Sequence, residues 1–227
     1  ASQIAKSAAL TTVADVHVPP QNAKNRLVVR NLPDASLITS SGELSATPTA
    51  IDIGDIRSSR GLKKILETAE IATNWKFELI GSVAAADKDY LENWQRTSPA
   101  ASRVNFHGKL APKQSWQCAK GAWVGLSLLD ATPAFVDAVP SKLYEYLTSG
   151  LAVVTTDLPR SAKVISESNA GVIANTPSEI ANAFIKFEGN KDLINQLRSN
   201  GANWAKNNLD SPAEYHRFTA AISNLLK

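Results

Sequence analysis

From residue 48 onward, short apolar runs alternate with longer segments in which apolar residues recur every three or four positions. The short runs lie at 50–53, 76–80, 103–106, 122–126, 151–156 and 170–173. In the segment 61–72 the apolar residues recur with the spacing of one helix face, and further helices are expected at 87–95, 112–119, 140–150, 177–186, 191–207 and 212–226. Strands that alternate with helices of this length form βαβ units. The sequence therefore predicts an α/β fold: a Rossmann-like, doubly wound parallel sheet of about six strands, followed by C-terminal helices.

The first 46 residues follow a different pattern. Residues 26–30 (RLVVR) are the one stretch there that predicts a strand. Residues 39–49 are rich in Ser and Thr, a composition typical of a linker. We therefore expect three segments, 1–46, 47–210 and 211–227, with the regular alternation in the second.

Composition narrows the class of protein. The chain has 227 residues, of which 44% are hydrophobic and 20% charged, which excludes extended disorder, collagen and coiled coil. A net charge of +3 without a basic block gives no support for a nucleic-acid partner. Cys118 is the single cysteine, so an internal disulfide is excluded, and no apolar run is long enough to cross a membrane. The chain contains no Met, from which we expect a processed or excised piece.

In open α/β sheets, ligands bind at the carboxyl ends of strands, next to helix N-termini. The first such turn is GDIRSSRG, residues 54–61. Its glycines, Gly54 and Gly61, allow a close backbone approach, and the guanidinium groups of Arg57 and Arg60 suit a phosphate. The alternative is a solvated turn with two surface arginines.

The second turn, at residues 137–146, leads into a helix that begins at Pro140. The N–H groups of Ser141 and Lys142 belong to its first turn and suit an anion. Glu145 points away from the helix face that packs on the sheet. It is placed either to accept hydrogen bonds from sugar hydroxyls beside a phosphate site, or to form an exposed salt bridge with Lys142.

The third turn contains His107, which follows a strand and either lines the crevice or is an ordinary surface residue. No spacing of His, Cys, Asp or Glu in the chain matches a metal-binding motif, so we expect no metal site.

Residues 140–156 (PSKLYEYLTSGLAVVTT) resemble the PSKLxEYLAxGxPVVAT signature of family 4 glycosyltransferases, which have the GT-B fold. Four other stretches occur in the order found in that family: RNLPD at 30–34, Gly54 with Arg60 and Gly61, LIG at 79–81, and VNFHG at 104–108. The resemblance covers roughly residues 28–210.

The resemblance implies a domain assignment. The family has two Rossmann-like domains, of which the C-terminal one holds a nucleotide-sugar donor and the N-terminal one mainly the acceptor. Residues 1–46 would be a remnant of the acceptor domain with the interdomain linker, residues 47–210 the donor-binding domain, and residues 211–227 the helix that crosses back to the first domain. The missing N-terminal domain is thus an expected partner.

The resemblance also implies roles for residues at the second turn. Glu145 matches the second member of the family's acidic pair and is expected on the donor ribose. Asp137 matches the first member and is expected beside the donor sugar in a catalytic role, although it is one methylene shorter than the family's Glu. Arg60 is expected to bind the diphosphate and to act catalytically, together with the N–H groups of Ser141 and Lys142.

Gly54, Arg57, Gly61 and His107 complete the expected donor-binding set. Many family members have Arg directly after the first loop glycine, where this chain has Asp55.

The function implied is that of the donor-binding half of a retaining glycosyltransferase in polysaccharide biosynthesis, inactive as this fragment alone. It would move a sugar from a nucleotide-diphosphate sugar to a glycan or lipid-linked acceptor without a metal cofactor, because cations and a helix N-terminus face the leaving diphosphate. The alternatives are a nucleotide-sugar binding module without transfer activity and a GT-B-fold nucleotide-sugar epimerase. The implied location is cytoplasmic, with peripheral attachment at the inner face of the membrane as the alternative.

Overall fold

The structure, a computed structural model, describes residues 2–14 and 18–226. These form two compact units, one of residues 35–206 and one from the described parts of residues 1–34 and 207–227. Residues 1, 15–17 and 227, which belong to the expected segments 1–46 and 211–227, lie outside the described residues.

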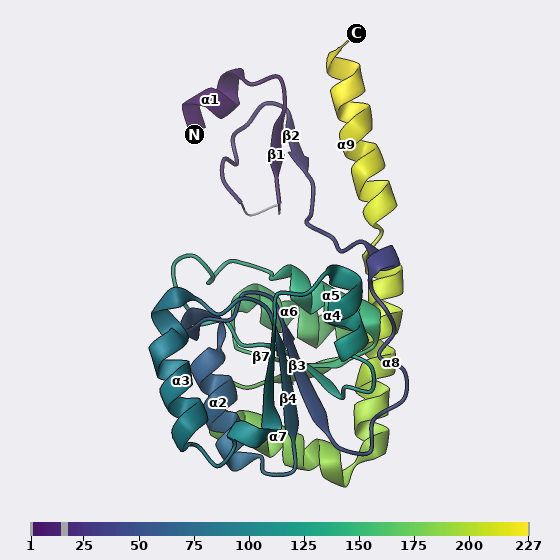
Figure 1. The fold of residues 1–227 in the computed structure, drawn as a ribbon. Coiled ribbons are helices and arrows are strands. Elements are labelled where there is room, and N and C mark those ends of the chain that lie inside the picture. Colours follow the sequence, from purple (N-terminus) through teal and green to yellow (C-terminus); the bar gives the residue numbers. More distant parts are fainter. Residues whose placement is uncertain (1, 15–17, 227) are drawn as a thin grey trace. The chain divides into compact units, whose positions relative to one another are not determined.

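The larger unit is built on a parallel sheet of six strands, which confirms the predicted fold class (Figure 1). The strands are β3 (Thr49–Ile53), β4 (Lys76–Ile80), β5 (Val104–Gly108), β6 (Val124–Ser127), β7 (Ala152–Thr155) and β8 (Gly171–Ile173). Their order is β5-β4-β3-β6-β7-β8, so the direction of winding reverses between β3 and β6. Such a reversal is where doubly wound sheets open a crevice for ligands.

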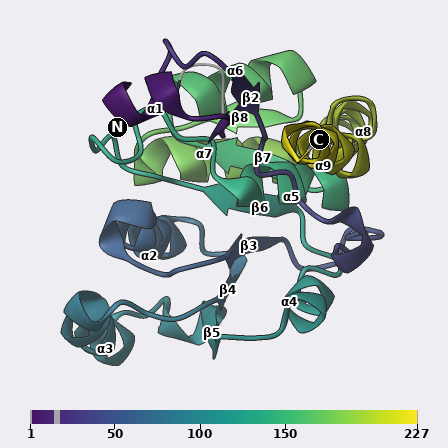
Figure 2. The same ribbon diagram turned by 90° about the horizontal axis from the view of Figure 1, so that it is seen from above.

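Helices cover both faces of this sheet. They are α2 (Leu62–Ile71), α3 (Lys88–Thr97), α4 (Pro112–Cys118), α5 (Ser141–Ser149), α6 (Pro159–Ser168), α7 (Pro177–Gly189) and α8 (Lys191–Asn208), the last of which runs on into the smaller unit. Figure 2 shows α2 and α3 on one side of the strands and α4 and α5 on the other. Short 3₁₀ turns at Ala35–Leu37 (η1), Ser58–Arg60 (η2), Ala85–Asp87 (η3) and Ala101–Arg103 (η4) lie in the connections.

Aromatic side chains form part of the core between the sheet and α7. The Trp75 and Phe184 rings stack with centroids 3.8 Å apart, and Trp123 meets Trp75 edge-on at 5.7 Å. All three side chains are almost completely buried. Aromatic pairs in these geometries add to the stability that comes from their burial.

The smaller unit contains a helix, a two-stranded parallel sheet and a C-terminal helix. These are α1 (Ser2–Ser7), β1 (Thr11–Val13), β2 (Arg26–Val28) and α9 (Ser211–Leu225). The strand expected at 26–30 forms as β2, but the expectation of a single strand in this region was wrong, because β1 also forms. Helix α1 was not predicted either. Both are too short for a periodic pattern to mark them in the sequence.

Two further features of the structure differ from the sequence-based interpretation. Helix α6 was not predicted, because two of the four residues on its buried face are serines and the apolar periodicity is therefore interrupted. The buried residues are Ser161, Val164, Ile165 and Ser168. The Ser-rich stretch expected to be a linker up to residue 46 belongs to the larger unit from Ala35 onward. There the buried Ser41 hydroxyl donates to the carbonyl oxygens of Ser149 and Gly150, at 3.0 Å each.

Candidate functional site

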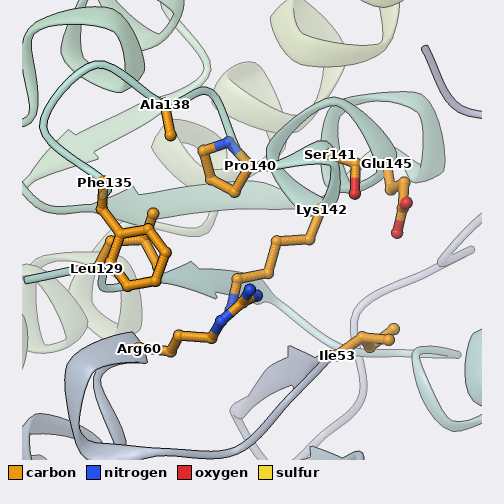
Figure 3. Close-up of a pocket in the computed structure, with 10 residues that line it drawn as sticks. Ile53, Arg60, Leu129, Phe135, Ala138, Pro140, Ser141, Lys142 and Glu145 are labelled. Atoms are coloured by element: carbon orange, nitrogen blue, oxygen red, sulfur yellow. The ribbon is translucent and has the colours of Figure 1, made fainter. Parts of the chain in front are cut away.

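A cavity opens where strands β3 and β6 separate. The two strands pair only at Ala50–Val124 and Ile51–Gly125. Beyond that point a cavity of about 320 Å³ opens beside the carboxyl end of β3 and the start of α5 (Figure 3). Its lining residues are Ile53, Gly54, Arg60, Leu129, Phe135, Ala138, Pro140, Ser141, Lys142 and Glu145.

Helix α5 presents its positive end to this cavity. Pro140 has extended backbone before the first helical residue, and no side chain caps the helix. Among the hydrogen bonds of the described residues, none satisfies the N–H groups of Ser141 and Lys142. Unsatisfied first-turn N–H groups, reinforced by the helix dipole, favour an anion here.

The Lys142 side chain differs from its sequence-based expectation. Its ammonium group donates to the Asp52 carboxylate on β3 instead of pairing with Glu145, and both residues are buried. In Figure 3 the Lys142 side chain extends from α5 into the same space as the Arg60 side chain from η2. The chain therefore places two cations at the cavity, one of which already has a counter-charge.

Glu145 lies on α5 at the cavity, as expected for a ligand-facing carboxylate. Burial raises the pKa of Glu145, although a hydrogen bond from Ser141 and the charge of Lys142 act in the opposite direction. A half-buried carboxylate at a ligand site can accept hydrogen bonds from hydroxyl groups of the ligand.

Arg60 faces the cavity from η2. Its guanidinium lies 5.5 Å from the centre of the Phe135 ring, and its Nε is buried without a hydrogen-bond partner among the described residues. The η2 turn itself is held by Asp87, which accepts from the Ser58 hydroxyl and from the Ser58 N–H at 2.9 Å. The hydroxyl bond in particular lowers the pKa of Asp87. A fixed guanidinium with an unpaired N–H is suited to an anionic ligand.

Two of the expected glycines have different roles at this site. Gly54 lines the cavity, whereas Gly61 does not and instead packs against Leu128, the residue that follows β6. A Cβ on Gly61 would lie 2.5 Å from the Leu128 Cβ, and its φ of +102° is rare for other residues. Gly61 thus lets η2 approach the sheet closely enough for Arg60 to reach the cavity.

Besides Gly61, three expected site residues do not line the cavity. Arg57 pairs with Asp55 at 3.0 Å. Asp137 has a side chain 78% exposed and lies 3.8 Å from the Arg160 Nε.

His107, the third of them, also lies elsewhere. Its Nε2 is 2.6 Å from the Glu78 carboxylate, on the adjacent strand β4. Side chains alternate along a strand, and in β5 the alternation directs His107 to Glu78.

A second cavity of about 220 Å³ adjoins the same strand end. Its lining residues are Ile53, Gly54, Asp55, Ile80, Gly81, Ser82, Lys109, Leu110 and Ser115. It shares Ile53 and Gly54 with the first cavity, so one extended ligand could occupy both.

The sequence analysis did not identify Asp52, Tyr146 or Phe135. The Tyr146 hydroxyl, which is fully buried, accepts from the Ile53 N–H at 2.9 Å, an N–H that β6 no longer reaches. For Asp52 a signal existed, since a carboxylate inside the apolar run 50–53 must be paired if that strand is buried. Nothing in the sequence marked Phe135.

No helix among the described residues is both long and apolar enough to span a membrane. Within residues 2–14 and 18–226, no group of three or more His, Cys, Asp and Glu side chains is arranged to hold a metal ion.

The sheet order and the cavity at its reversal define a Rossmann-like α/β protein with a site suited to an anionic ligand. Residues 37–204 match the family described as glycosyl transferases group 1, and the chain belongs to that family. No curated protein sequence matches the chain.

Solved structures share the fold. Sucrose-phosphate synthase from Thermosynechococcus elongatus superposes with a TM-score of 0.80 at 13% identity, over 99% of this chain and 60% of that one. HepE from Anabaena, in complex with UDP-glucose, superposes with a TM-score of 0.75 at 14% identity, over 90% of this chain and 59% of HepE. The C-terminal domain of a group 1 family protein (LpcC) from Francisella tularensis superposes with a TM-score of 0.62 at 15% identity, over 78% of this chain and 97% of that domain. The chain thus spans about three fifths of the first two proteins and has the fold of a GT-B glycosyltransferase domain.

Proposed function

We propose that this chain is the donor-binding half of a retaining glycosyltransferase, which transfers a sugar from a nucleotide-diphosphate sugar to a glycan or lipid-linked acceptor. The observation that carries the proposal is the cavity where β3 and β6 separate. There the unpaired Nε of Arg60, the uncapped start of α5 and the Glu145 carboxylate line one space.

Each part of the donor has a matching group. The diphosphate lies between Arg60 and the N–H groups of Ser141 and Lys142. Glu145 accepts hydrogen bonds from the ribose hydroxyls, a use of acidic residues known in other doubly wound nucleotide sites. The base occupies the second cavity, beside Lys109 and Leu110. HepE, a structural neighbour, has been solved with UDP and with UDP-glucose, which supports this class of ligand.

The proposed chemistry is electrostatic. As the bond to the sugar breaks, negative charge grows on the leaving diphosphate, and fixed N–H groups and cations stabilise that charge without a metal. Removing one such donor in other enzymes costs about 2.7–4 kcal/mol of transition-state stabilisation. The acceptor site is assigned to the additional length that the larger structural neighbours have, so this chain alone is expected to bind donor without transfer.

Calorimetric titration with UDP, GDP and dTDP tests the binding step, first with EDTA and then with Mg²⁺. Binding of one nucleotide is expected in both, with affinity lost at least tenfold in Arg60→Met. Arg96→Met is the matched control, because Arg96 is exposed on α3 and lies outside both cavities. Absence of binding, strict dependence on Mg²⁺, or equal affinities in the two variants would contradict the proposal.

A second candidate is a nucleotide-sugar binding module without transfer activity. It is favoured by Asp137, whose exposed carboxylate lies near Arg160 and outside the cavity. Transfer assays on a chain extended by the additional length of the larger structural neighbours separate the candidates, with the product followed by proton NMR. A glycosylated acceptor that keeps the anomeric configuration of the donor supports a retaining enzyme, whereas a donor that is bound but not transferred supports the module. A released sugar that is epimerised would support the epimerase alternative.

A further inference from the structure

Asp52 places a carboxylate inside the central strand of the sheet. It is 2% exposed, and its neighbours along β3 are Ile51 and Ile53. An ionised carboxylate in such a position is costly unless it is paired and hydrogen-bonded. The Lys142 ammonium, 6% exposed, is its partner, and Lys142 also lines the cavity.

The buried surroundings of Lys142 would disfavour a positive charge that had no counter-charge beside it. Burial favours the neutral form of an amine. The charged and titratable groups that face this space are Asp52 from β3, Arg60 from η2, and Glu145 and Tyr146 from α5 itself. Arg60 is a second cation at the same cavity, and the Tyr146 hydroxyl is neutral. Asp52 is therefore the buried anion in direct contact with the Lys142 ammonium.

We propose that Asp52 is a positioning residue: it holds the Lys142 side chain at the cavity and supplies the counter-charge of its buried ammonium group, so that this group is in place when the diphosphate arrives. The inference rests on the proposed donor site and extends it to a residue that does not touch the ligand. Asp52 acts through Lys142 and is not itself a catalytic residue.

The proposal fixes the sign of a pH effect. In Asp52→Asn the shape is kept, but the buried ammonium has lost its counter-charge and releases its proton at a lower pH than an exposed lysine. A bound diphosphate would restore a negative charge beside Lys142 of the variant. Nucleotide binding must therefore be accompanied by proton uptake at any pH at which the Lys142 amine of the unliganded variant is neutral. Nucleotide affinity of the variant should then weaken as pH rises, by up to about tenfold per pH unit.

The experiment is titration calorimetry of the full chain with the nucleoside diphosphate that the wild type binds, from pH 7 to pH 9. The wild-type dissociation constant is expected to change by less than about twofold, and that of Asp52→Asn to rise progressively, with proton uptake seen as a dependence of the heat on the buffer. The matched control is Asp52→Asn with Lys142→Arg, which should have a flat profile because a guanidinium stays protonated throughout this range. If the bond between Asp52 and Lys142 had only a structural role, Asp52→Asn would lower the stability of the fold but would not make nucleotide affinity depend on pH.

Parallel pH profiles of the wild type and Asp52→Asn would overturn the inference. If Asp52→Asn does not fold, NMR of the wild-type chain labelled with ¹⁵N-lysine replaces it. The Lys142 ammonium signal should shift when the nucleotide is added, whereas a signal that the nucleotide leaves unchanged would overturn the inference. An ammonium signal held by its partner in a chain that binds no nucleotide would support the pairing and refute the proposed donor site, so the two failures are distinguishable.

Discussion

Replacing Tyr146 with Phe tests how helix α5 is fastened to the centre of the sheet. The change removes only the hydroxyl that accepts from the Ile53 N–H at 2.9 Å. The Tyr146 ring is fully buried, and a Cβ on Gly125 would lie 2.4 Å from it, so the ring is closely packed and Phe would keep its place. The Ile53 N–H, which is part-buried, would then lose its hydrogen-bond partner within the fold.

The expected cost follows from that lost hydrogen bond. One intramolecular hydrogen bond contributes about 0.5–1.5 kcal/mol to stability. For a domain of this size, about 2–4 °C in melting temperature corresponds to each kcal/mol. Tyr146→Phe should consequently unfold roughly 1–6 °C below the wild type.

Urea unfolding followed by tryptophan fluorescence is the assay, because all five tryptophans lie within the compact unit of residues 35–206. Tyr90→Phe is the control, since Tyr90 is on the surface of α3 and its loss of a hydroxyl should change the free energy of unfolding by less than about 0.5 kcal/mol. If the two variants are equally stable, the hydroxyl does not fasten α5 to β3 and our account of the cavity floor is wrong.

Three further outcomes are expected. Gly61→Ala should cost about 2–5 kcal/mol in urea unfolding, because its Cβ would lie 2.5 Å from the Leu128 Cβ at a positive φ; a loss below 1 kcal/mol would refute the steric argument. Glu145→Gln should weaken nucleotide binding yet stabilise the fold at pH 8 by about 0.5–2 kcal/mol. Burial raises the pKa of Glu145, so its ionisation costs stability as pH rises above the ordinary 4.5, and urea melts from pH 4 to 8 should show the gain disappearing in acid. Burial alone would raise the pKa of Glu214, but hydrogen bonds from the Arg30 backbone and side chain and from a neighbouring guanidinium lower it. Its contribution to stability is thus complete above pH 4.5 and is lost as pH falls through the lowered value. Glu214→Gln should cost about 1–3 kcal/mol at pH 7, seen as faster hydrogen exchange in α9, and unchanged exchange would contradict it.

Most of the larger unit could be predicted from the sequence, because its strands are apolar runs and its helices have one apolar face. The strand at 151–156 and the helix at 140–150 are examples, and both form close to the predicted bounds as β7 and α5. Helix α6 could not be found in this way, because serines occupy half of its buried face. Hydroxyl groups can be buried when their hydrogen bonds are satisfied within the helix, so burial does not always leave an apolar pattern.

The candidate site was predicted only in part. Residues whose role depends on their place at a chain turn, such as Arg60, Ser141 and Glu145, do line the cavity. Asp137 and His107 follow the same logic but have side chains directed to Arg160 and Glu78.

The sequence by itself determined the α/β alternation, the membership of a glycosyltransferase family, and the turns at which ligand groups gather. These properties follow from local patterns: apolar periodicity, helix starts, and glycines in loops. Only the tertiary structure decided which charges meet. Asp52 and Lys142 are 90 positions apart in the chain, and they form a pair because β3 and β6 separate at the reversal of the sheet and α5 lies beside the opening. Such a pairing depends on strand order and helix placement, and no local pattern in the sequence records either.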